Sequence, residues 1–400
     1  MKWLNCAEIR LVLVGFVVAI VLGGGSANAD FTFGTPVNLG PTINSPHSDI
    51  PGSFSSDGLE MYFDSNLSGG AMKDDIYVST RATTDDAWGT PVKLGPPVNS
   101  SGSDICPIIS TDGLSLYFTS HSRAGGYGVN DIWVATRATV SDPWGEPSNL
   151  GPTINTSTDD VASSMSFDGL VLYFYSHIRP GGHGLWDIWV STRPTTNDAW
   201  GEPVNLGPTV NSSYSDGSPC ISANGLLLFF FSNRPGGFGD RDLYMTRRAT
   251  IDDDWGIPVN LGPTINTSAL DGFATILPDC STLYFSSDRP GGVGDWDIWQ
   301  APINPIVDFN ADGIVDSADM CTMVDHWGTD EPLCDIGPMP WGDGIVDVQD
   351  LIVLAEHLFE EPGLIAYWKL DEEKGDIAYN DIGDNHGILS GNPAWQPDAG

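Results

Sequence analysis

A fivefold internal repeat constrains the fold of this chain more than any other feature of its sequence. An aromatic residue followed by glycine returns at steps of 55, 56, 56 and 55 residues. The five pairs are Phe33-Gly34, Trp88-Gly89, Trp144-Gly145, Trp200-Gly201 and Trp255-Gly256. A regular period of about 50 residues is typical of solenoids, propellers and other arrays.

Each copy predicts four short antiparallel strands. A first strand leads into an Asp-Gly or Asn-Gly turn, the strongest short hairpin signal, which has decayed to Asp279-Cys280 in the fifth copy. An aromatic-rich strand such as LYF follows, then a Gly-Gly loop, a third strand such as DIWV and a short fourth strand in PVNLG. No helical periodicity interrupts the copies. We therefore predict a mainly β chain with a five-bladed β-propeller over residues 30–303.

The repeat pattern SxDGxxLYFxSxRPGGxGxxDIW resembles the WD40-like β-propeller repeat of TolB-type propellers. The resemblance covers about residues 31–303. TolB itself carries six such blades, whereas this chain has five copies of the pattern.

One aspartate opens the expected innermost strand of each copy. These residues are Asp49, Asp104, Asp160, Asp216 and Asp271. By symmetry they would form a ring around the central channel, where adjacent carboxylates would bind a cation or a polar ligand. In the alternative, which turn chemistry favours, each carboxylate only accepts backbone hydrogen bonds within its own blade.

Two further features recur around the Gly-Gly loop. Four arginines are expected to form ion pairs within a blade, across this loop, and the first copy has Leu67 in place of the arginine. The expected pairs are Arg123 with Asp131, Arg179 with Asp187, Arg234 with Asp242 and Arg289 with Asp297. The loop aromatics Tyr127, Trp186, Phe238 and Trp296 differ between copies. They are candidates either for ligand contacts or for packing between blades.

The segment after residue 304 has the spacing of calcium-binding loops. The first loop would bind calcium through Asp308, Asn310, Asp312, Ile314 (by its carbonyl), Asp316 and Asp319. A degenerate second loop would use Asp343, Ile345, Asp347 and Asp350. Its first half is irregular: position 1 falls on Met339 unless an insertion lets Asp335 serve instead.

Two such loops, each followed by an apolar helical segment, resemble a type I dockerin over residues 304–361. The resemblance implies calcium as a cofactor, an EF-hand-type α-helical module and a cohesin as a possible partner. A calcium-stabilised spacer is the alternative. Residues 362–400 resemble the start of a LamG or concanavalin A-like jelly roll, of which about forty residues are too few for the whole domain.

Residues 1–29 have the basic start, apolar run and small residues of a secretory signal peptide, with cleavage before Asp30. An uncleaved anchor is the alternative, and no other stretch could span a membrane. We therefore expect a secreted, periplasmic or extracellular protein without a membrane span in the mature chain. Cys321 and Cys334 are the best candidates for a disulfide, whereas Cys106 and Cys220 fall in repeat strands, where buried free thiols are common.

The net charge and the absence of known catalytic motifs limit the classes of function that this sequence can have. The formal net charge of −37, from 16 basic and 53 acidic residues, argues against nucleic acid as a partner, because phosphate backbones are held by Lys and Arg. No nucleophile elbow, zinc-protease motif or P-loop is present, and every prominent acidic position repeats. We therefore expect a binding platform for an extracellular polysaccharide or protein. The alternative is a glycoside hydrolase that uses acidic residues at the propeller funnel.

Overall fold

The computed structural model describes residues 31–67, 73–307, 309, 315, 317–329, 334–337, 345–357, 377–378 and 387–388. The chain divides into two compact units. One is Gly23–Pro305, and the other takes Met1–Leu22 together with Ile306–Gly400. The predicted signal peptide, residues 1–29, lies outside the described residues.

Within the described residues, the first unit contains five antiparallel sheets, each built around four strands, and is a five-bladed β-propeller. Blade 1 consists of β3 (Asp49–Phe54), β4 (Glu60–Ser65), β5 (Asp75–Thr80) and β6 (Val92–Lys93). Blade 2 consists of β7 (Asp104–Ile109), β8 (Ser115–His121), β9 (Asn130–Thr136) and β10 (Ser148–Asn149). Blade 3 consists of β11 (Asp160–Met165), β12 (Val171–His177), β13 (Trp186–Thr192) and β14 (Val204–Asn205). Blade 4 consists of β15 (Asp216–Ile221), β16 (Leu227–Ser232), β17 (Asp242–Arg247) and β18 (Val259–Asn260), and the short helix α2 (Gly207–Val210) precedes it.

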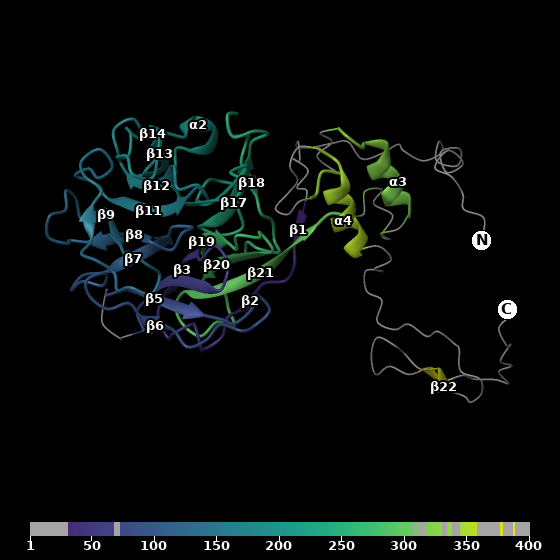
Figure 1. Cartoon of the computed structure of the whole chain (residues 1–400), viewed down its shortest axis with the longest axis horizontal. Helices are drawn as coiled ribbons and strands as arrows, with labels where there is room; N and C mark the ends of the chain where they lie inside the picture. Colours follow the sequence, from purple (N-terminus) through teal and green to yellow (C-terminus); the bar gives the residue numbers. More distant parts are fainter. Residues whose placement is uncertain are drawn as a thin grey trace, which may run out of the picture. The chain divides into compact units, whose positions relative to one another are not determined.

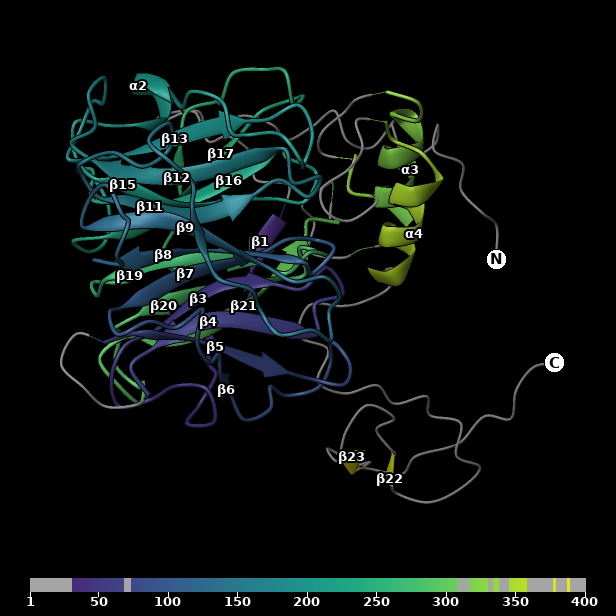
Figure 2. The same cartoon turned by 60° about the vertical axis from the view of Figure 1, so that its left-hand side comes forward.

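The N-terminal end of the propeller completes the last blade. Blade 5 consists of β19 (Asp271–Ile276), β20 (Thr282–Ser287), β21 (Asp297–Pro305), β2 (Val37–Asn38) and β1 (Phe31–Phe33). Strand β2 takes the outer position by pairing with β21, with Val37 opposite Gln300. The purple first blade and the green last blade therefore lie side by side, with β3 next to β19 and β20 (Figures 1 and 2). The prediction of five blades is confirmed.

The repeated motifs explain how each blade forms. Gly58 of the first Asp-Gly turn has φ of 68°, a conformation that glycine adopts without a Cβ clash. In the fifth copy Cys280 adopts it instead, with φ of 53°. The central aromatic of each second strand is completely buried. These five residues are Phe63, Phe118, Phe174, Phe230 and Phe285.

The repeated Trp-Gly pair packs between blades. Trp88 stacks on Phe54 at 5.9 Å between ring centroids and also contacts Tyr284 of the last blade. Arg81 covers the Trp88 ring at 4.3 Å from its centroid. The same arginine–tryptophan contact occurs for Arg137 with Trp144, Arg193 with Trp200 and Arg248 with Trp255. The tryptophan that recurs with the period of the repeat therefore makes a structural contact.

The second unit contains a small helical core. Helices α3 (Ser317–Asp325) and α4 (Val348–His357) each follow a predicted calcium loop. Met323, Val346 and Leu354 are buried together with Cys334. Of the predicted jelly-roll start, only the two-residue strands β22 (Ile377–Ala378) and β23 (Gly387–Ile388), which pair with each other, are described. Among the described residues, no helix is long and apolar enough to cross a membrane.

Candidate functional site

The five repeated aspartates do not form an open ring. All five side chains are completely buried. Asp49 accepts the backbone N–H of Ser45 at 2.6 Å and the hydroxyl of Ser65, both in its own blade. The other four accept the equivalent backbone N–H at 2.6–2.7 Å, from Ser100, Thr156, Ser212 and Thr267. The structure places Asp49, Asp104, Asp160, Asp216 and Asp271 inside the blades, where side-chain donors join the backbone N–H groups that the alternative interpretation expected.

The expected arginine pairs are wrong in their partners. Each arginine folds back to the aspartate that opens the innermost strand of its blade. The observed pairs are Arg123 with Asp104 (3.0 Å), Arg179 with Asp160 (3.2 Å), Arg234 with Asp216 (2.7 Å) and Arg289 with Asp271 (2.6 Å). The aspartates that were expected to pair accept backbone N–H groups of the Gly-Gly loop instead. Asp131, for example, accepts the N–H of Tyr127 at 2.7 Å.

Blade 1 lacks this ion pair. Leu67 takes the place of the arginine, and no cation contacts Asp49 among the described residues. Burial raises the pKa of Asp49 to about 6, although the hydrogen bonds from Ser65 and Ser45 oppose the shift. Blade 1 instead contains an ion pair between Lys93 and Asp75.

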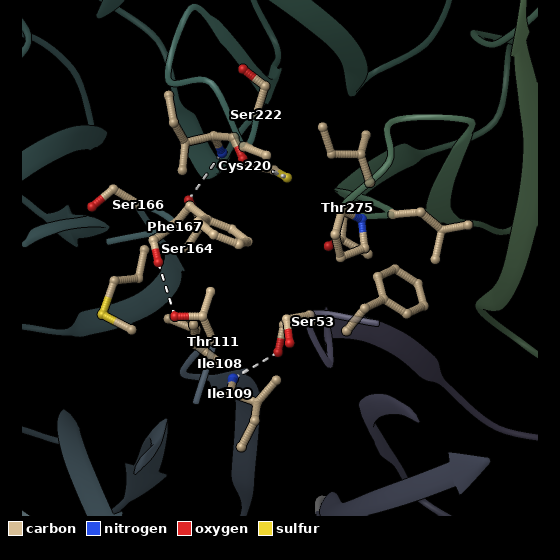
Figure 3. A pocket seen from close by; sticks show the side chains of 18 of the residues that line it. Ser53, Ile108, Ile109, Thr111, Ser164, Ser166, Phe167, Cys220, Ser222 and Thr275 are labelled. Atoms are coloured by element: carbon tan, nitrogen blue, oxygen red, sulfur yellow. Dashed lines mark hydrogen bonds between the residues drawn. The ribbon is translucent and has the colours of Figure 1, made fainter. Parts of the chain in front are cut away.

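One end of the central channel is narrow and is used for contacts between blades. The ends of all five innermost strands enclose a cavity of about 100 Å³ there (Figure 3). Hydroxyl groups lie around it, and two of them hold neighbouring blades together. The Ser53 hydroxyl accepts the N–H of Ile109 at 2.9 Å, and the Ser164 hydroxyl accepts the N–H of Ile221 at 3.2 Å. These groups are therefore already committed to structural bonds.

A larger cavity of about 480 Å³ involves the opposite ends of the innermost strands. Five side chains of blades 3–5, here called the aromatic arc, follow one another there: Trp186, Tyr175, Phe231, Phe273 and Trp296. Successive ring centroids lie 5.2, 6.0, 5.6 and 5.7 Å apart. Four of these rings line the cavity, and Trp296 extends the row. A ligand-sized cavity with aromatic walls is typical of small-molecule binding sites.

The arc depends on departures from the repeat. Copies four and five have Gly217 and Gly272 where the first three copies have Ile50, Ile105 and Val161. A Cβ atom on Gly217 would lie 2.8 Å from Cζ of Phe231 and 2.9 Å from Cδ2 of Tyr175. A Cβ atom on Gly272 would lie 3.0 Å from Cδ of Arg241. The two glycines therefore make room for the side chains of the cavity.

Arg241 is the cation of this cavity. Its guanidinium lies 4.2 Å from the ring centroid of Phe231, 5.4 Å from that of Phe273 and 5.7 Å from that of Trp296. Burial lowers its pKa, although an arginine of this kind stays charged. Other copies have Asp74, Asn130, Trp186 and Trp296 at the same repeat position.

An acidic group lies near the arc. Asp64 is 3% exposed and accepts the N–H of Cys106 at 2.7 Å. Burial raises its pKa well above the ordinary value, and the charges of Asp74 and Asp49 raise it further. Burial also raises the pKa of Tyr175, with smaller contributions from Cys106 and Asp64, whereas Arg241 lowers it. Asp64 is the only acidic residue at its repeat position, where other copies have Thr119, Tyr175, Phe231 and Ser286.

Two of the four loop aromatics named from the sequence belong to the candidate site, and two do not. Trp186 and Trp296 belong to the aromatic arc, whereas Tyr127 and Phe238 are about half exposed and do not line the cavity. Tyr175, Phe231, Phe273 and Arg241 were missed. The signal that could have identified them is the loss of the branched aliphatic residue at Gly217 and Gly272.

Most of the predicted calcium ligands lie outside the described residues: Asp308, Asn310, Asp312, Ile314, Asp316 and Asp343. Ile345, Asp347, Asp319 and Asp350 are described, and the last two are completely buried. Asp319 accepts the N–H of Phe309 at 2.7 Å, ten residues before it, and Asp350 accepts that of Ile336 at 2.6 Å, 14 residues before it.

The two contacts are equivalent in the two predicted loops. Phe309 is the second position of the first predicted loop, and if Ile336 is its counterpart, Asp335 takes position 1 of the second. The second loop is then four residues longer than the first, which is the insertion considered above. Asp347 and Asp350 also cap α4, because Asp347 accepts the N–H of Gln349 and Asp350 accepts that of Asp347. Within the described part of the chain, no group of three or more His, Cys, Asp or Glu side chains is placed to hold a metal ion.

The described residues show no Cys321–Cys334 disulfide, which corrects the prediction. Cys321 is itself disulfide-bonded. The Cys334 side chain is buried in the core of the second unit with Met323 and Ile336. Cys106 and Cys220 are free thiols, as expected, although Cys106 is only partly buried.

A scan against models of protein families finds no match, and no curated protein matches the sequence. Solved structures match the propeller. A protein described as TolB from Agrobacterium tumefaciens aligns with 13% identity over 70% of this chain and 99% of its own, with a TM-score of 0.40. A thermostable family-43 glycoside hydrolase aligns with 14% identity over 66% of this chain and 92% of its own (TM-score 0.43). An α-L-arabinofuranosidase from Lactobacillus brevis aligns with 14% identity over 67% and 92% (TM-score 0.43). At identities and scores this low we transfer no property of these proteins to this chain.

Proposed function

We propose that this chain is a secreted binding protein whose propeller holds an extracellular carbohydrate at the aromatic arc. The observation that carries the proposal is a row of five aromatic side chains, in positions where the repeat is broken, beside a cavity of about 480 Å³. The C–H faces of sugar rings stack on aromatic rings, and polar groups at the rim fix the orientation of the ligand. Scaffold residues recur in every blade, whereas these residues do not.

The second unit would attach the protein to a partner. We propose that its two loops bind calcium in the manner of a dockerin and that the partner is a cohesin. Equivalent contacts of Asp319 and Asp350 with the second residue of each loop support this interpretation. Bound calcium would neutralise the clustered carboxylates and contribute folding free energy, because hard cations prefer oxygen ligands.

Substitution of Trp186 tests the carbohydrate site. Binding of soluble extracellular polysaccharides to the intact protein is measured by affinity electrophoresis, and the best ligand is then titrated calorimetrically. Trp186→Ala should weaken binding at least about tenfold, because one aromatic contact is lost. Phe238→Ala is the matched control, since this aromatic is exposed outside the cavity. Equal losses in the two variants, or no binding of any polysaccharide, would overturn the proposal.

A glycoside hydrolase is the second candidate, and Asp64 is the observation that favours it. A buried carboxyl group with a raised pKa keeps its proton to a higher pH than an exposed one does, which suits a general acid. Release of reducing sugar from the bound polysaccharide, abolished in Asp64→Asn while binding persists, would establish hydrolysis. Binding without turnover in the unmodified protein would exclude it for that ligand.

A further inference from the structure

We propose that the cavity at the aromatic arc selects a ligand that carries a single carboxylate, such as one uronic acid residue in an otherwise neutral glycan, and that Arg241 binds this carboxylate. This inference rests on the proposed carbohydrate site and specifies its ligand.

Arg241 differs from the arginines of the repeat. Arg123, Arg179, Arg234 and Arg289 each contact a buried aspartate at 2.6–3.2 Å. The Arg241 guanidinium forms no ion pair with any described residue, and it lies over the rings of Phe231, Phe273 and Trp296. A half-buried cation loses part of its hydration, and an anion from outside the chain would compensate for that loss.

The stacking geometry suits a carboxylate. The guanidinium carbon lies 4.2 Å from the Phe231 centroid, and among the described residues the guanidinium N–H groups of Arg241 donate no hydrogen bond, so they are available to a ligand. Arginine binds carboxylates through two parallel N–H donors, which fixes both position and orientation. The sugar ring that carries the carboxylate would then lie against the neighbouring aromatic rings.

Charge limits the ligand to few carboxylates. The chain has a formal net charge of −37, and Asp240 lines the same cavity. Tyr175 of the arc also experiences the charge of Asp159. A polyuronate would be repelled by this field, which decays over about 8 Å at physiological ionic strength. A mainly neutral glycan with one acidic residue places its charge on Arg241 and avoids most of the repulsion.

Matched pairs of sugars test the inference. Glucuronate, galacturonate and mannuronate are each compared with the neutral hexose of the same configuration, by ligand-detected NMR titration of the full chain. We expect at least one uronate to bind about tenfold to 100-fold more tightly than its hexose, the range for a charge-assisted hydrogen bond. Arg241→Gln should abolish this preference, so that the uronate and its hexose bind with the same affinity. Arg123→Gln, which removes a structural arginine, should keep the preference and lower the melting temperature.

The outcomes separate this inference from the proposed function. Equal binding of uronates and hexoses, with both lost in Trp186→Ala, would overturn the role of Arg241 but keep the carbohydrate site. A uronate preference that survives in Arg241→Gln would also overturn it. Absence of binding in all three pairs contradicts both.

Discussion

Replacing Leu67 by arginine should restore the ion pair that blade 1 lacks. The backbone N–H of Leu67 donates to the Ser65 hydroxyl at 3.0 Å, and those of Arg234 and Arg289 donate to the equivalent serines at 3.2 Å. The Leu67 backbone therefore holds the position from which an arginine reaches the buried aspartate in blades 4 and 5. In blade 1 that aspartate is Asp49.

The size of the effect follows from the pKa of Asp49. Burial raises this pKa from 3.8 to about 6. Between these values the folded state binds a proton that the unfolded state does not, so the free energy of unfolding falls by about 1.4 kcal/mol per pH unit as pH rises. The loss approaches about 3 kcal/mol above pH 6. An arginine that stabilises the ionised carboxylate should recover part of it, about 1–3 kcal/mol at pH 7 after the cost of ordering the side chain.

Urea unfolding of Leu67→Arg at several pH values measures this gain. Leu67→Met is the control, because it changes the side chain without adding charge. The stability difference between the two variants should be small at pH 4, where Asp49 is protonated, and should grow to its full size above pH 6. A gain that is equal at pH 4 and pH 7, or no gain at pH 7, would refute the reasoning.

Two further substitutions test the site and the calcium loops. Gly217→Val introduces the residue of blade 3 and should lower the free energy of unfolding by about 1–3 kcal/mol, because the new side chain overpacks against Phe231 and Tyr175. Carbohydrate binding should be lost as well. Thermal unfolding and ligand titration measure the two effects, and a variant that binds normally would contradict the account of the arc. Asp335→Ala should lower the calcium affinity of the second loop at least about tenfold, because one charged oxygen ligand is lost, whereas Met339→Ala should leave that affinity unchanged. Calorimetric calcium titration measures both variants. The opposite ranking would place position 1 of the loop at Met339.

Much of the propeller could be predicted from the sequence because its signals are local and repeated. The Asp-Gly or Asn-Gly turns of four copies, the aromatic second strands and the PVNLG-like segments define the blades, and the first PVNLG segment supplies β2 of the last blade. The ion pairs could not be predicted correctly. Sequence spacing places Arg123 between Asp104 and Asp131, and only the path of the Gly-Gly loop determines which carboxylate the guanidinium reaches.

The candidate site was harder to predict from the sequence, because its residues do not recur in every copy of the repeat. Conserved features of the copies, such as the five aspartates, turned out to be buried scaffold. The cavity depends on Gly217 and Gly272, which lack a side chain, and on Arg241, which forms no ion pair with any described residue. Such properties depend on what surrounds a residue in three dimensions, which the sequence pattern does not contain.

The central claim is that a carbohydrate occupies the aromatic arc, and a crystal structure with the best-bound oligosaccharide tests it most directly. Electron density for a sugar ring should lie against Trp186 or Phe231, with a carboxylate at Arg241. Sugar density at the narrow end of the channel, or on the loops that carry Tyr127 and Phe238, would contradict the account.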